Sequence, residues 1–275
     1  MSRHTPRPAR ALALVAALAL ITSTLAAHDL FLKLDTYSLP ENTDVRVPVL
    51  NGTFRMSESV VARERVGALT LVGLRGSTAL DTTALTARND TSFISLRTGG
   101  SGTYVLGLSV LPRTVDYTGE QLNEYLKAEG YEDVLAERTR NGTLGQSGRR
   151  RYATHVKAVF QVGQTGSIAF SAILGHAAEI VPLDNPYDLE RGATLRLRCL
   201  LDGQPVAGLV MRAGGLNPKG GTIAEAAVQT DRNGVARVPL TTAGRWYVKF
   251  AKMRPFAGPD INYESQRATL TFEVR

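Results

Sequence analysis

The residue with the clearest chemical potential is His28, which becomes the first residue of the mature chain if an export signal is removed after Ala27. An N-terminal histidine offers an α-amine and an imidazole that can chelate one metal ion together. Nitrogen ligands of this kind suit copper and nickel, and an α-amine with a pKa of about 8 gives up its proton to a metal at neutral pH. We therefore interpret His28 as the anchor of a site for a Ni, Co or Cu ion.

Two further histidines could complete such a site. His4 leaves with the export signal, so His176 and His155 are the remaining candidates as metal ligands, with carboxylates such as Asp29 or Glu179 adding oxygen ligands. The spacing of these histidines is not a metal motif by itself. The alternative interpretation is that both are ordinary structural or surface histidines.

The sequence offers little support for catalysis. It contains no G-x-S-x-G, H-E-x-x-H or P-loop pattern, and no motif for an organic cofactor. The segment Asp231–Gly234 has two oxygen side chains at calcium-loop spacing but lacks the later acidic ligand, which favours a hairpin turn. We expect a protein that is not an enzyme.

The lone cysteine, Cys199, excludes intrachain disulfides and zinc-thiolate clusters. It alternates with Leu195, Leu197 and Leu201, which predicts one buried strand face. We expect Cys199 to be a small buried hydrophobic residue rather than a nucleophile.

Residues 1–27 have the layout of a secretory signal peptide. Three arginines precede an apolar run from Ala11 to Ile21, and small residues follow up to Ala27. A membrane-spanning helix takes about 20 apolar residues, so we interpret the segment as cleaved rather than as a retained anchor. Cleavage after Ala26 is the alternative. We expect residues 28–275 to be periplasmic or secreted.

The charge of the mature chain limits its partners. The 275-residue sequence has 32 Lys and Arg against 25 Asp and Glu, and residues 1–27 hold three arginines and no acids, so +4 remains after cleavage. An excess this small needs no nucleic-acid or membrane partner. We expect no nucleic-acid binding and no direct membrane insertion after cleavage.

The first half of the mature chain, residues 28–175, has mainly strand patterns. Apolar stretches at 45–50, 68–74, 92–96 and 103–110 are separated by polar turns. Residues 118–138 instead show helical spacing, with a capping box at Thr118 and Gln121 and a break at Gly130, which predicts one or two short helices. The following segment NGTLGQSGRRR predicts a flexible basic loop, either solvated or a polyanion site, before a strand at 152–161.

The second half, residues 176–275, contains about seven strands in roughly 95 residues, an immunoglobulin-like count. In RWYVKF, Trp246, Val248 and Phe250 should point to one face, and Tyr247 and Lys249 to the other. We therefore predict a mainly β protein with two immunoglobulin-like β-sandwich domains, at 28–175 and 176–275. The short helical insertion at about 118–138 belongs to the first.

The assembled segments resemble a family of exported bacterial proteins often described as nickel-uptake periplasmic components (NikM-like). The resemblance lies in AHDLFLKLDTYSL, RYATHVKAVFQVG, GHAAEIVPLDNPYDLERGATLRLRCLLDGQPVAG, TDRNGVARVPLTTAGRWYVKFAKM and YESQRATLTFEV. It implies a β-rich periplasmic accessory that delivers Ni²⁺ or Co²⁺ to a membrane metal transporter, and the Ala-His junction carries the metal role to His28. Family members often have a histidine near the position of Lys252, which is lysine here. The second half is also similar to transthyretin- or carboxypeptidase-regulatory-like sandwiches through TDRNGVARV.

Our first hypothesis is therefore a non-enzymatic transition-metal-binding accessory protein linked to nickel or cobalt uptake. The alternative is a structural or interaction module that binds an envelope protein or glycan, and it predicts an exposed apolar or aromatic patch, most naturally at Tyr125 and Tyr131. A third interpretation, an enzyme acting on envelope substrates, predicts a deep pocket lined by polar groups.

Overall fold

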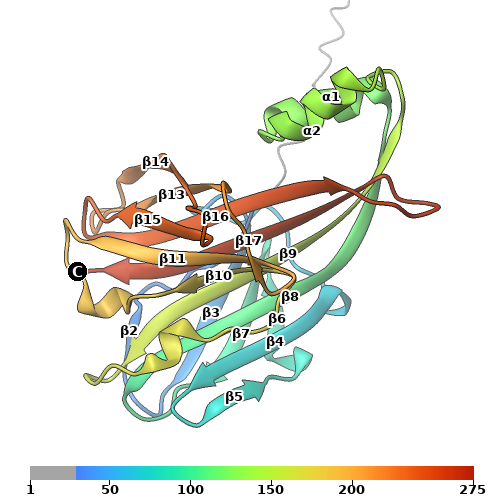
Figure 1. The fold of residues 1–275 in the computed structure, drawn as a ribbon. Coiled ribbons are helices and arrows are strands. Elements are labelled where there is room, and N and C mark those ends of the chain that lie inside the picture. Colours follow the sequence, from blue (N-terminus) through green and yellow to red (C-terminus); the bar gives the residue numbers. More distant parts are fainter. Residues whose placement is uncertain (1–28) are drawn as a thin grey trace, which may run out of the picture.

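The computed structural model describes residues 29–275, so His28 and the predicted export signal lie outside the described residues. These residues form a mainly β structure with two α-helices, which confirms the predicted class (Figure 1). None of the helices in this part of the chain is long and apolar enough to span a bilayer.

A nine-stranded sheet is the central layer of the molecule. Its strands, in spatial order, are β14 (Thr222–Gln229), β13 (Val210–Leu216), β16 (Gly244–Pro255), β17 (Tyr263–Val274), β9 (Gly148–Val162), β8 (Gly102–Tyr117), β4 (Val66–Gly73) and β5 (Gly76–Ala79), with β2 (Ser38–Leu39) beside β9.

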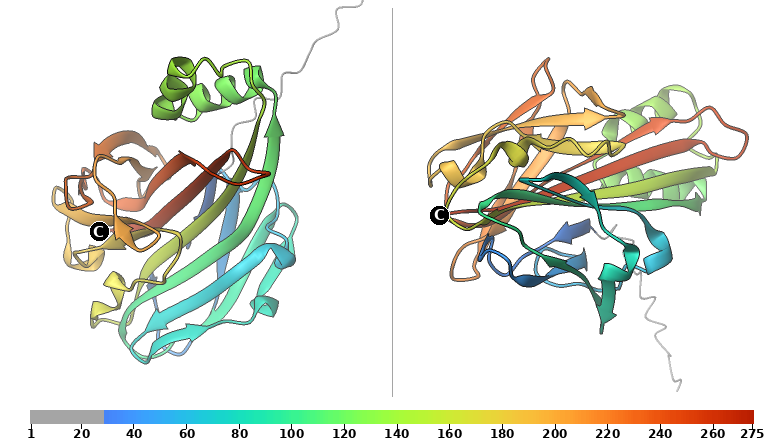
Figure 2. Two further views of the ribbon diagram at one scale, coloured as in Figure 1. Left: turned by 45° about the vertical axis from the view of Figure 1, so that its right-hand side comes forward. Right: turned by 90° about the horizontal axis from the view of Figure 1, so that it is seen from below.

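Two four-stranded sheets cover opposite faces of this layer (Figure 2). The first contains β1 (Asp29–Leu32), β3 (Asp44–Gly52), β7 (Thr91–Arg97) and β6 (Leu85–Arg88). The second contains β10 (Ala178–Pro182), β11 (Thr194–Leu201), β12 (Gln204–Pro205) and β15 (Val235–Pro239). Short 3₁₀ turns lie at η1 (Arg63–Arg65), η2 (Thr82–Ala84), η3 (Ile168–Ser171) and η4 (Pro186–Asp188).

Each small sheet encloses a hydrophobic core against the central one. Leu106 and Phe160 of the central sheet pack with Val47 of β3 in the first core. Cys199 and Trp246 belong to the second core. The burial of Cys199 and the alternation along β16 confirm the patterns predicted for these strands.

The two predicted halves share one sheet. β17 from the second half pairs in parallel with β9 from the first, over Tyr263–Thr271 and Arg150–Ala158. β16, β13 and β14 continue the sheet outward from β17. The predicted boundary at residue 175 therefore does not separate two independent sheets, because the central sheet contains hydrogen-bonded strands from both halves.

The helical insertion consists of α1 (Gly119–Ala128) and α2 (Glu132–Arg140), at the far ends of β8 and β9 (Figure 1). The side chain of Thr118 accepts from the backbone of Gln121, and the Gln121 side chain accepts in return, so the predicted capping box is present. Gly130 lies between the helices with a φ of 74°, the left-handed region that favours glycine. The prediction of one or two short helices with a break at Gly130 is confirmed, and the structure has two.

The prediction of a flexible loop at Arg149–Arg151 is wrong, because β9 begins at Gly148. Arg150 is buried, and its guanidinium donates to the hydroxyls of Tyr125 at 2.7 Å and Tyr117 at 3.0 Å. A run of three arginines carries no burial signal, so the sequence alone could not separate Arg150 from its exposed neighbours.

Candidate functional site

A cleft of about 620 Å³ opens where the turn between α1 and α2 faces β16 and the start of β1. Its walls come from segments far apart in the sequence, and their shared feature is charge. The charged lining residues are Asp29, Glu129, Glu132, Asp133, Arg212, Glu225, Lys249, Lys252 and Arg267.

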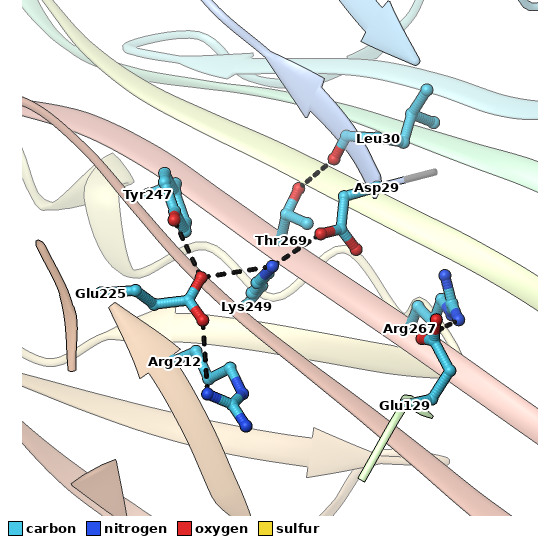
Figure 3. A network of polar contacts seen from close by, with 9 residues as sticks. All are labelled: Asp29, Leu30, Glu129, Arg212, Glu225, Tyr247, Lys249, Arg267 and Thr269. Carbon is cyan, nitrogen blue, oxygen red and sulfur yellow. Dashed lines mark hydrogen bonds and ion pairs between the residues drawn. The ribbon is translucent and has the colours of Figure 1, made fainter. Parts of the chain in front are cut away.

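Lys249 is the centre of a network on one wall (Figure 3). Its Nζ lies 2.7 Å from Oδ2 of Asp29 and 3.3 Å from Oε2 of Glu225. Glu225 also accepts a hydrogen bond from the hydroxyl of Tyr247 at 2.9 Å and pairs with Arg212 at 3.4 Å. Strand alternation positions this network, because Tyr247 and Lys249 share the face of β16 opposite the buried Trp246 face.

The electrostatics of the network favour its charged state. Burial lowers the pKa of Lys249, but the carboxylates of Asp29 and Glu225 outweigh it and the pKa is raised. Burial alone would raise the pKa of Glu225. Lys249 and Tyr247 have a larger effect in the opposite direction, and the pKa of Glu225 is therefore lowered. Lys249 and Glu225 are therefore both ionised at neutral pH.

The inner wall of the cleft carries a second ion pair. Nη2 of Arg267 lies 2.7 Å from Oε2 of Glu129 and 3.0 Å from the hydroxyl of Tyr125. Burial lowers the pKa of Arg267, and the combined effect of Tyr125, Tyr131 and Glu129 raises it. Nε of Arg267 and the hydroxyl of Tyr131 are buried without a hydrogen-bond partner in the described part of the chain.

The rim of the cleft is closed by Lys252, whose Nζ lies 2.5 Å from Oδ2 of Asp133 at the start of α2. The lining as a whole holds five carboxylates and four cationic side chains. The cleft lining is thus slightly acidic, whereas the whole sequence has a net charge of +7.

Two of the three histidines predicted as metal ligands lie together. The rings of His155 and His176 are 5.3 Å apart between centroids. Nδ1 of His155 lies 2.8 Å from the hydroxyl of Ser109, and Nε2 lies 3.1 Å from Oε1 of Gln266. Both nitrogens of His155 therefore have partners already.

His176 differs, because both of its ring nitrogens are buried without a hydrogen-bond partner among residues 29–275. Burial, followed by the neighbouring His155, lowers the pKa of His176 to about 4. The buried pair Lys157 and Glu179 lies beside it, with 2.9 Å between Nζ and Oε1. In the described residues no three His, Cys, Asp or Glu side chains gather closely enough to hold a metal ion.

The histidine pair and the cleft lie on opposite faces of the central sheet. Lys249, which holds Asp29, pairs with Thr269 of β17, whereas His155 pairs with Ala268. Consecutive strand residues point to opposite faces. Asp29 and His155 therefore belong to separate sites, and His28, which precedes Asp29, lies outside the described residues.

Sequence reasoning missed most of the cleft. The alternation in RWYVKF placed Lys249 on an outward face, but nothing in the sequence linked it to Asp29, 220 residues away. Glu129 and Glu225 come from a helix end and an edge strand with no motif of their own. The Asp231 hairpin formed as predicted, and its carboxylate accepts from the backbone N–H groups of Asn233 and Val235.

Comparisons with known proteins give a family but no activity. A family model described as "Domain of unknown function (DUF4198)" matches residues 25–253. None of the curated proteins matches the chain.

Similar solved structures include three much longer chains. A tetra-tandem repeat in the extending region of a large adhesion protein is 14% identical with a TM-score of 0.23, over 90% of this chain and 49% of that one. A Salmonella alpha-2-macroglobulin mutant is 9% identical with a TM-score of 0.23, over 89% and 15%. The E. coli alpha-2-macroglobulin is 10% identical with a TM-score of 0.22, over 90% and 14%. The chain thus spans less than half the length of each, and at these scores the likeness carries no functional argument.

Proposed function

The chain belongs to the DUF4198 family, a domain of unknown function, and from its residues and geometry we propose that it is an exported, non-enzymatic protein that binds a transition-metal ion at its mature N-terminus. The bound ion is Ni²⁺, Co²⁺ or Cu²⁺, and the protein serves nickel or cobalt uptake by presenting the ion to a membrane transporter. Each half of the chain forms an immunoglobulin-like sandwich in this proposal.

One observation carries the proposal. Asp29, which is covalently joined to His28, and Lys252 line the same cleft. The first is next to the chelating terminus, and the second is the position near which members of the resembling family often have a histidine; here it is a lysine paired with Asp133 and supplies no metal ligand. They are 223 residues apart in the sequence, so their meeting is a property of the fold.

The charge of the cleft supports a cation at this place. Five carboxylates face four cationic side chains in its lining, and the amine and imidazole of His28 supply the nitrogen ligands that copper and nickel prefer. Carboxylates add oxygen ligands, although Asp29 and Glu225 already share Lys249. Any carboxylate that turns to a metal must therefore exchange one ion pair for another.

Binding fits the cleft better than catalysis does. Lys249, Arg267 and Lys252 are each paired with a carboxylate, so none of these cations is poised to act on a substrate. The cleft does offer the polar walls that an enzyme would need, but among the described residues its lining holds no serine, threonine or cysteine.

An interaction module for an envelope protein or glycan is the second candidate. The exposed side chains of Ile168 and Ile173, 85% and 62% accessible beside η3, favour it. The segment in which we expected its aromatic patch does not supply one, because Tyr125 and Tyr131 are buried. This candidate predicts a thermal stability that is indifferent to metal.

The test is calorimetric titration of the mature protein with Ni²⁺, Co²⁺ and Cu²⁺, after intact mass has confirmed that it begins at His28. We expect submicromolar binding that falls at least 100-fold in His28→Ala. His176→Gln is the matched control and should bind as tightly as the wild type, since it lies on the opposite face of the sheet. Equal binding by wild type and His28→Ala would overturn the proposal.

A further inference from the structure

A second groove, on the outer face of the sheet that contains β11 and β15, gathers arginine side chains that the metal proposal does not use. Its volume is about 640 Å³. The charged residues in its lining are Arg196, Arg198, Asp231, Arg232 and Arg237. Four guanidinium groups therefore face one carboxylate.

The strand register places two of these arginines directly opposite each other. β11 and β15 are antiparallel neighbours (Figure 1), and Arg196 is the partner of Arg237 across them. Both are exposed, while Leu195 and Leu197 on the other face of β11 are buried. Like charges opposite each other on adjacent strands destabilise a sheet, and Asp184, which interacts with both arginines, reduces that cost.

The carboxylates nearby neutralise only part of the positive charge of the groove. Asp184 pairs with Arg196 at 2.5 Å between Oδ1 and Nη2. Asp231 is engaged with the backbone of its own turn, and those hydrogen bonds lower its pKa.

The remaining three arginines are not in close ion pairs. Arg198, Arg232 and Arg237 make no ion pair or side-chain hydrogen bond with any residue in 29–275. Asp231 acts electrostatically on Arg232 and Arg237, and Asp184 on Arg237. Four arginines against these two carboxylates still leave the groove with a net positive charge.

We propose that this groove binds a soluble ligand that carries two or more phosphate groups. A guanidinium presents a planar fork of N–H donors that matches phosphate oxygens, and forks from two strands and a turn can reach more than one phosphate. A soluble ligand fits better than a membrane surface, because the groove lining has no aromatic side chain to anchor in a bilayer. The inference is independent of metal binding at the N-terminus.

The test is calorimetric titration of the mature protein with sodium tripolyphosphate at fixed ionic strength, with orthophosphate and sodium sulfate as comparison anions. We expect saturable tripolyphosphate binding that weakens at least tenfold in Arg237→Gln. Arg88→Gln removes the same charge from an exposed arginine of β6, on the far small sheet, and should weaken binding less than twofold. Without ligand, Arg237→Gln should melt at the same temperature as the wild type or higher, because it relieves the opposed charges.

Three results would overturn the proposal. They are absence of saturable tripolyphosphate binding, an equal loss in Arg237→Gln and Arg88→Gln, and binding to phosphatidylglycerol vesicles in preference to tripolyphosphate. The second would show a response to net charge alone, and the third a membrane surface as the partner. A lower melting temperature for ligand-free Arg237→Gln would remove the argument from opposed charges.

Discussion

Lys249 holds Asp29 at 2.7 Å, which ties the first residue of β1 to β16 near the other end of the chain. The backbone carbonyl of Leu30 accepts a hydrogen bond from Thr269 at 2.8 Å and strengthens the same attachment (Figure 3). The start of β1 is therefore fixed at the cleft by charge and by hydrogen bonding. This attachment is the physical basis of the proposed terminal metal site.

Replacement of Lys249 by Met should destabilise the protein by about 2 kcal/mol near pH 7, because two half-buried carboxylates lose their cation. Because folding raises the pKa of Lys249, its ion pairs stabilise the protein fully below pH 10.5, the ordinary pKa of lysine. This stability is lost as the pH rises through the pKa of Lys249 in the folded protein. Because folding lowers the pKa of Glu225, its ionised carboxylate stabilises the protein above pH 4.5, the ordinary pKa of glutamate. This stability is lost as the pH falls through the pKa of Glu225 in the folded protein. Urea denaturation of both proteins at pH 4, 7 and 10 measures this, and an equal cost at pH 4 and 7 would contradict it.

The patterns of single strands and turns were predictable from the sequence, but their partners were not. Alternation placed Trp246 in the core, and the Thr118 capping box and Gly130 marked the two helices. The parallel pairing of β9 with β17 joins residues more than 100 positions apart. Periodicity states which face of a strand is buried and carries no information about its neighbour, so the continuous central sheet emerged from the structure alone.

The buried pair of Lys157 and Glu179 should be the most sensitive ion pair of the protein to single substitution. Both side chains are almost fully buried, 2.9 Å apart. Lys157→Met should cost about 3–5 kcal/mol, because it leaves an uncompensated carboxylate, and adding Glu179→Gln should recover part of that loss. Arg97→Met, at the exposed pair with Asp44, should cost less than about 1 kcal/mol. Similar costs at both places in urea denaturation would refute the contrast.

His176 should make stability fall in mildly acidic solution. Its pKa is about 4 in the folded protein and ordinarily 6.5, so the unfolded chain binds the proton first. Stability should therefore decline as pH falls from 6.5 towards 4, by up to about 3 kcal/mol. His176→Gln should show a shallower decline over the same range. Identical pH profiles for the two proteins would mean that His176 takes no part.

Two neighbouring tyrosines should respond in opposite ways to loss of the hydroxyl. The hydroxyl of Tyr125 accepts from both Arg150 and Arg267, so Tyr125→Phe should cost about 1–3 kcal/mol. The hydroxyl of Tyr131 is buried without a partner in the described chain, so Tyr131→Phe should be neutral or stabilising. Thermal melts of the two variants provide the comparison, and a larger loss for Tyr131→Phe would contradict the hydrogen bonding described.

The sequence indicated the candidate histidines, but it did not indicate the ion pair at the centre of the cleft. His28 stood out through its place after the signal, and His155 and His176 through their type. The structure adds the ion pair between Asp29 and Lys249. This ion pair depends on the packing of β1 against β17. Such a contact is a product of tertiary packing, and no local propensity or spacing encodes it.

The most direct test of the terminal metal site is to add one residue to it. Mature protein that begins at His28 and a matched form that begins at Ala27 are compared by intact mass and by calorimetric titration with Ni²⁺ and Cu²⁺. The account predicts submicromolar Ni²⁺ binding to the first form and at least a 100-fold loss in the second, because the added alanine places a peptide unit between the α-amine and the imidazole. The loss for Cu²⁺ should be smaller, because Cu²⁺ can also bind the nitrogen of that peptide unit. Equal affinities, or a natural terminus other than His28, would contradict it.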